Sequence, residues 1–153
     1  MKTQERVSKA LRLLYKNALE IRQDVDIFKN YSDLSYLHEY GTIKLCSHRQ
    51  AGHTTSIVDL IEKYSQEPFC IIWNSKRQKD YIQNLLDERG IRTNVSFLPF
   101  SFDENAYRGL NNHTIIVDMS SFIFNQKKTH PLNKHKKYLE KSLNKTNILI
   151  YLQ

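Results

Sequence analysis

Cysteine is scarce in this sequence, with only Cys46 and Cys70 among 153 residues. Each lies inside a short apolar run typical of a buried strand, which argues against a disulfide framework and favours a reducing compartment. Long apolar runs are missing too, because none approaches the roughly 18–20 residues needed to span a bilayer. The polar start of the chain, MKTQERVSK, lacks the apolar centre of a signal peptide. We therefore expect a cytoplasmic protein that does not use a membrane.

Acidic residues are nearly absent between Gln126 and Thr146, where Glu140 stands against seven lysines and the local charge is +6. The whole chain carries only +7. Charge gathered on one segment indicates a polyanionic partner better than a high pI does. We therefore expect DNA or RNA to bind this segment, whose candidate contacts are Lys127, Lys128, Lys134, Lys136, Lys137 and Lys141. The alternative is a lysine-rich helix and loop that faces solvent and binds nothing.

Linker-like tracts of glycine, serine or proline are also missing, and the length fits one core on the usual size of roughly 100–200 residues per domain. Near the N-terminus, apolar residues recur at spacings of four and three, which predicts one amphipathic helix over about residues 3–29. The residues of this stripe are Val7, Leu11, Leu14, Ala18, Ile21, Val25 and Phe28. The stripe could pack on the protein's own core, form the seam of a homodimer or dock on a protein partner.

A short second helix is predicted in YSDLSYLHEYG, with Ser32 as its N-cap and Gly41 as its end. Residues 1–40 thus form a helical extension that packs on a core of residues 41–153.

After Gly41, short apolar runs alternate with helical segments. The runs are TIKLC, FCIIW, NVSFL, TIIVD and NILIYL, and four of them are continuous, as in strands buried on both faces of a parallel sheet. Helices are predicted at Thr54–Ser65, at Lys76–Arg89 before Gly90, and at about Leu132–Leu143. This order predicts a three-layer α/β domain with a mainly parallel five-stranded sheet.

The segment after the first predicted strand, SHRQAGHTT, has the pattern of a phosphate-binding loop. Aligned to G-x-x-x-x-G-K-[ST], it has Gly52 as the last glycine, His53 in place of the lysine and Thr54 as the hydroxyl residue. Backbone N–H groups of such a loop, and of the helix that follows it, can hold a phosphate without a lysine. The expected phosphate-binding residues are Ser47, Arg49, Gln50, Ala51, Gly52, His53, Thr54 and Thr55.

A second motif follows the fourth predicted strand, where HTIIVDMSS places four apolar residues before Asp118. An aspartate at this position holds Mg²⁺ or its waters in nucleotide-hydrolysing enzymes, so Thr54 and Asp118 are the expected Mg²⁺ ligands. We also expect the strand that ends at Asp118 to lie beside the first strand.

Together the two motifs resemble those of P-loop NTPases of the RecA-like group, most closely the ATPase domain of phage terminase large subunits and related helicases. Those proteins carry Arg-Gln-x-Gly-Lys-Thr, where this chain has Arg49-Gln50-Ala51-Gly52-His53-Thr54. The segment NSKRQKDYI resembles the next helicase-type segment. The resemblance covers about residues 41–153. It implies a P-loop NTPase-like fold, ATP and Mg²⁺ as ligands, nucleic acid as partner, and a phage protein of the host cytoplasm.

Two departures from that pattern favour slow or absent hydrolysis. Histidine has a shorter side chain than lysine and lacks its permanent charge, so His53 supports phosphate less well than the missing lysine. Met119 stands where the family places a glutamate that orients the attacking water, and methionine cannot accept a proton. Asp103 or Glu104 could substitute for that glutamate. If the protein is an enzyme, the resemblance implies an ATPase.

The same residues allow two other interpretations. SHRQAGHTT could be an ordinary strand-to-helix turn, with Thr54 or Thr55 as helix cap and no ligand. His53 and His113 each precede a threonine, which resembles the paired His-x-Thr motifs of two-histidine phosphodiesterases. In those enzymes the two histidines act as general base and general acid. The second copy of the motif has Ile115 in place of its final threonine.

Overall fold

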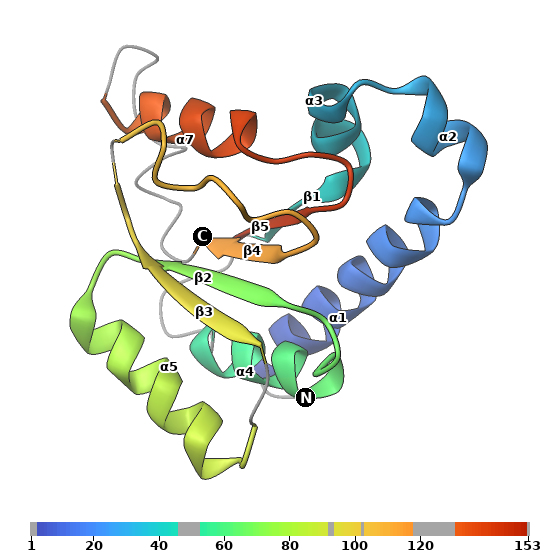
Figure 1. The fold of residues 1–153 in the computed structure, drawn as a ribbon. Coiled ribbons are helices and arrows are strands. Elements are labelled where there is room, and N and C mark those ends of the chain that lie inside the picture. Colours follow the sequence, from blue (N-terminus) through green and yellow to red (C-terminus); the bar gives the residue numbers. More distant parts are fainter. Residues whose placement is uncertain (1–2, 46–52, 92–93, 102, 118–130, 153) are drawn as a thin grey trace.

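The computed structural model describes residues 3–45, 53–91, 94–101, 103–117 and 131–152 (Figure 1). Its five strands all pair in parallel, in the order β1-β5-β4-β2-β3. They are β1 (Thr42–Leu45), β2 (Phe69–Trp73), β3 (Val95–Pro99), β4 (Thr114–Val117) and β5 (Ile148–Leu152). The predicted five-stranded parallel sheet is confirmed, and each strand agrees with its apolar run to within about one residue at either end.

The position of each strand in the sheet explains its pattern of burial. Every residue of β4 and β5 is buried, as are the first four residues of β2. The edge strands β1 and β3 stay partly exposed. A central strand of a parallel sheet is covered on both faces and must therefore be apolar at every position.

Helices cover both faces of the sheet. On one face lie α1 (Thr3–Arg22), α4 (His53–Lys63) and α5 (Lys76–Glu88), and on the other lies α7 (Pro131–Lys141) (Figure 1). Ile71 and Ile116 point into the first core, whereas Ile72 and Ile115 point into the second. Successive residues of a strand face opposite sides of the sheet, so these runs build two cores and three layers.

The prediction of one helix over about residues 3–29 is wrong. The first helix ends at Arg22, and α2 (Val25–Asn30) begins after Asp24, whose carboxylate accepts the backbone N–H groups of Asp26 and Ile27. This cap satisfies N–H groups at the start of a new helix and so divides the longer apolar pattern in two.

The chain continues through α3 (Asp33–Tyr36) and a π-helical turn, η1 (Leu37–Gly41). Ser32 caps α3 as predicted.

The buried face of α1 also differs from the predicted stripe. Leu11 is fully buried, but Leu14 is 40% exposed, and Tyr15 takes the interior position instead. The Tyr15 hydroxyl hydrogen-bonds to Oγ1 of Thr114, the first residue of β4, at 2.8 Å. Burial raises the pKa of Tyr15 to about 12. Tyr15 therefore joins the N-terminal helix to the centre of the sheet.

The order of the strands corrects one further expectation. The strand that runs toward Asp118 is β4, and it does not lie beside β1, because β5 lies between them. The strand after α7 is β5, and it joins the sheet between β1 and β4 rather than at the edge beyond β1. This arrangement depends on contacts between residues that lie far apart in the sequence. Two strand spacings separate β1 from β4, or about 10 Å. Both strands still end at the same edge of the sheet, since all five are parallel.

Candidate functional site

The edge of the sheet at which the strands end, its carboxyl edge, is where this fold would place a ligand. There β2 leads into α5 on one face of the sheet. Its neighbour β4 is followed, after residues outside the described part, by α7 on the opposite face. Open α/β sheets bind ligands beyond the carboxyl ends of their strands, where the strand order reverses.

The start of α4 is the described part of the predicted phosphate loop. His53, Thr54 and Thr55 form the beginning of this 11-residue helix, and all three are half-buried. The first N–H groups of a helix have no partner within it and lie at the positive end of its dipole, so they attract anions. The predicted residues Ser47, Arg49, Gln50, Ala51, Gly52 and Asp118 lie outside the described residues.

In the part of the chain that the structure describes, three helices begin at the carboxyl edge, and their first turns share one property. Figure 1 shows α4, α5 and α7 starting on the side of the sheet where the strands end. None of these three first turns contains an acidic residue. The helices that begin elsewhere differ, because α1, α2 and α3 carry Glu5, Asp26 and Asp33 in their first turns. An acid at a helix start stabilises the helix, and its absence leaves the positive end of the dipole open to an external anion.

The first turn of α5 adds cations to this edge. Lys76 and Arg77 are exposed there, after Ser75 caps the helix by accepting the Gln78 N–H. Lys79 lies 5.4 Å from the ring centre of Trp73, the last residue of β2. These cationic side chains and the positive ends of the helix dipoles both attract anions, so the described part of the edge fits a phosphate.

His135 holds α7 against the carboxyl end of β3. It is fully buried, its ring stacks on Phe100 with centroids 3.7 Å apart, and its Nε2 lies 2.6 Å from the Tyr107 hydroxyl oxygen. That hydroxyl also accepts the Ser101 N–H at 2.8 Å and lies 3.5 Å from the Ser101 carbonyl oxygen. Burial lowers the pKa of His135 to about 4 and raises that of Tyr107 to about 12. His135 was not among the candidate residues from the sequence, although it lies four residues before the buried Leu139 on the same helix face.

The lysines of α7 divide into two groups. Lys136 Nζ lies 3.3 Å from Oε1 of Glu140, a buried carboxylate whose Oε2 lies 2.9 Å from His38 Nε2. Lys137 and Lys141 are exposed, and neither forms an ion pair with another described residue. Lys127 and Lys128 lie outside the described residues, as does the side chain of Lys134.

Other candidate residues are not brought together. His53 begins α4 at the carboxyl edge, whereas His113 directly precedes β4 at the opposite edge, so the two histidines do not share a site. Asp103 and Glu104 are exposed in the segment after β3. Among the described residues, no group of three or more His, Cys, Asp or Glu side chains could hold a metal ion.

Two comparisons with known proteins leave the chain without an identified relative. No protein-family model matches it, and no curated protein matches it either. In the described part of the chain, no helix has both the length and the apolar character needed to cross a membrane.

The lowered pKa of His135 predicts an acid-sensitive fold. The folded state keeps His135 neutral down to about pH 4, whereas the unfolded chain takes up this proton near the ordinary value of 6.5. Stability should therefore fall as the pH drops from 6.5 to 4, with a contribution from His135 on the order of 3 kcal/mol. In His135→Phe this part of the pH dependence should disappear, as measured by urea unfolding at pH 7 and pH 4.5. His113→Phe is the control, and an equal pH dependence in both variants would contradict the assignment.

Proposed function

We propose that this chain is a small P-loop NTPase-like accessory protein of nucleic-acid metabolism, of the phage type that its motifs resemble. It binds DNA or RNA, and it keeps a phosphate site that hydrolyses nucleotide slowly or not at all. The observation that carries the proposal is the acid-free start of α4, α5 and α7 at the carboxyl edge of the sheet.

The nucleotide part of the proposal rests on the start of α4. Its first-turn N–H groups would contact phosphate oxygens, and Thr54 in the same turn would add its hydroxyl to the Mg²⁺ shell. Asp118, which follows β4 in the sequence, would add its carboxylate to the same shell if Mg²⁺ binds. When bound, Mg²⁺ would neutralise charge on the phosphates. His53 and Met119 are the reason to expect little turnover.

The nucleic-acid part rests on α7. This helix starts at the same edge, where His135 packs against Phe100 just after β3. It carries the exposed Lys137 and Lys141. A polyanion bound along the helix would therefore pass close to the phosphate site. Lys136 has a structural role with Glu140, so its substitution would test folding rather than binding.

Restoring the missing lysine tests the nucleotide site most sharply. His53→Lys should bind Mg-ATP more tightly than the natural chain by roughly 10-fold to 100-fold, because a charged hydrogen bond contributes about 1.5–3 kcal/mol. Thr54→Ala in the His53→Lys background should remove much of that gain. Isothermal titration calorimetry would measure both effects. Thr3→Ala, at the exposed start of α1, is the matched control. If His53→Lys gains no affinity, the segment is an ordinary turn.

Removing the two exposed lysines tests the nucleic-acid surface. The double variant Lys137→Gln, Lys141→Gln should bind a single-stranded oligonucleotide more weakly. The salt slope, which is the fall of log affinity with log salt concentration, should become less steep by roughly 0.7 for each phosphate that is no longer neutralised. Fluorescence anisotropy across a salt series measures both quantities. The double variant Lys9→Gln, Lys29→Gln removes the same charge from exposed positions on α1 and α2. Equal weakening in the two double variants would mean that net charge alone drives binding.

A further inference from the structure

A groove of about 420 Å³ lies between α7 and the segment that joins β3 to β4. Its lining residues are Glu104, Arg108, Gly109, Tyr138, Lys141 and Ser142. Arg108 belongs to none of the motifs recognised in the sequence, yet the fold brings it to the same groove as Lys141. The groove therefore adds a cation from a second part of the chain to the basic face of α7.

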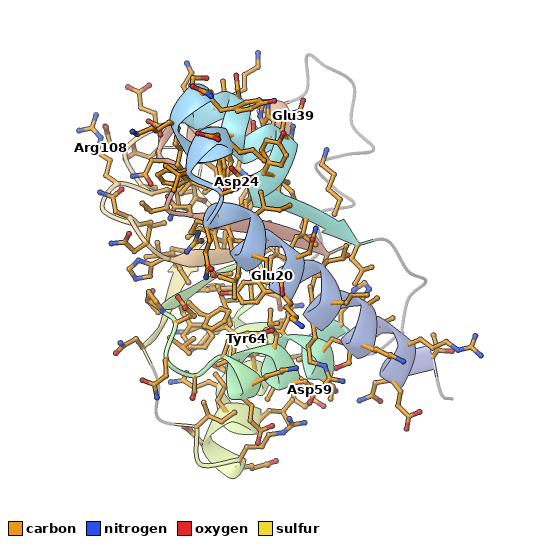
Figure 2. The ribbon with its side chains drawn as sticks, turned by 90° about the vertical axis from the view of Figure 1, so that its right-hand side faces the viewer. Glu20, Asp24, Glu39, Asp59, Tyr64 and Arg108 are labelled. Atoms are coloured by element: carbon orange, nitrogen blue, oxygen red, sulfur yellow. The ribbon has the colours of Figure 1, made fainter. Side chains whose placement is uncertain are left out.

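The chain holds Arg108 at the surface by anchoring the residues around it. Tyr107 is fully buried and bonded to His135, and Leu110 is buried in the same core. Gly109 has a φ of +83°, a conformation that residues with a side chain rarely adopt, and it turns the chain between the two anchors. Figure 2 shows the Arg108 side chain at the outer edge of the molecule. A tightly held backbone thus carries a solvent-facing guanidinium group.

The charges that line the groove are not used in ion pairs within the described part of the protein. Arg108, Lys141 and Glu104 are all exposed, and none pairs with another described residue. Ser142 is fixed by donating its hydroxyl proton to the Tyr138 carbonyl at 2.9 Å. Two cations against one carboxylate leave the groove with a net positive charge. The planar guanidinium of an arginine can also donate two parallel hydrogen bonds to the oxygens of one phosphate.

We propose that this groove binds a backbone phosphate of the DNA or RNA strand, with Arg108 and Lys141 as its two cationic contacts. The inference rests on the proposed nucleic-acid binding and extends the binding surface beyond the lysine-rich segment. Glu104 faces the same phosphate and weakens its binding by repulsion. Because phosphate contacts do not read the base or the sugar, DNA and RNA strands of equal length use the groove equally.

The test compares two substitutions with opposite expected signs. Fluorescein-labelled oligothymidylate and oligouridylate are titrated with the full chain, with Arg108→Gln and with Glu104→Gln across a salt series. Arg108→Gln should weaken binding of both strands by roughly tenfold and make the fall of log affinity with log salt concentration less steep by about 0.7. Glu104→Gln should strengthen binding. The matched control is Arg6→Gln, which removes an exposed arginine from α1 and should leave affinity close to that of the natural chain.

The outcomes separate this inference from the proposed function. If the natural chain binds and the Lys137, Lys141 double variant binds more weakly, but Arg108→Gln matches Arg6→Gln, the groove is not a phosphate site and the proposed function stands. If Glu104→Gln weakens binding, the groove assignment is overturned as well. If the natural chain binds neither strand, the nucleic-acid proposal and the groove fall together. Thermal unfolding of each variant, together with Arg108→Lys, which keeps the charge, separates a direct effect on binding from an effect on folding.

Discussion

Parallel pairing of all five strands is the constraint on which the rest of this structure depends. Parallel neighbours cannot be joined by a tight turn, so the chain must cross back over the sheet after each strand. Where a helix makes that crossing, it runs opposite to the strands and begins at their carboxyl edge. The starts of α4, α5 and α7 are therefore gathered at one edge by topology alone. The positive character of that edge is a consequence of the fold before any side chain is considered.

The side chains in the first turns of these three helices do not cancel the positive ends of the helix dipoles. Acids are missing from the first turns of these three helices, whereas Asp59 and Glu140 join helices elsewhere in the described part of the protein. Asp59 accepts the Ser8 hydroxyl from α1 at 2.8 Å and pairs with Arg89 at 2.6 Å, and so links three helices on one face. On the other face, Glu140 is surrounded by Lys136, His38 and Tyr151, and both burial and this carboxylate raise the pKa of Tyr151. Asp59 and Glu140 thus stabilise the packing of helices, and neither lies in the first turn of a helix that begins at the carboxyl edge.

Features that depend on neighbouring residues could be predicted from the sequence. Continuous apolar runs identified the strands, and the start of α4 agreed with its motif to within about one residue. The break at Asp24 was missed because a single capping side chain competes with a longer apolar pattern. Tyr15 was missed for a different reason. Its ring is apolar enough for the core, but its hydroxyl needs a partner on β4, and only the fold supplies one.

Features that depend on distant residues could not be predicted from the sequence. The place of β5 between β1 and β4 depends on pairing with strands far away in the sequence, and nothing local to β5 specifies it. The lysines of α7 look alike in the sequence, yet Glu140 holds Lys136 while Lys137 and Lys141 face solvent. The groove at Arg108 shows no sequence pattern, because its cations come from two segments that meet only in the folded chain.

We propose that the start of α4 holds phosphate. Backbone amide chemical shifts measured by NMR during a titration with Mg-ATP test it most directly, since they report on N–H groups one by one. We expect the largest changes at Thr54 and Thr55, in the first turn of α4. The amides near Glu5, at the acid-bearing start of α1, should stay unchanged. Changes elsewhere with none in the first turn of α4, or no change at millimolar nucleotide, would contradict it.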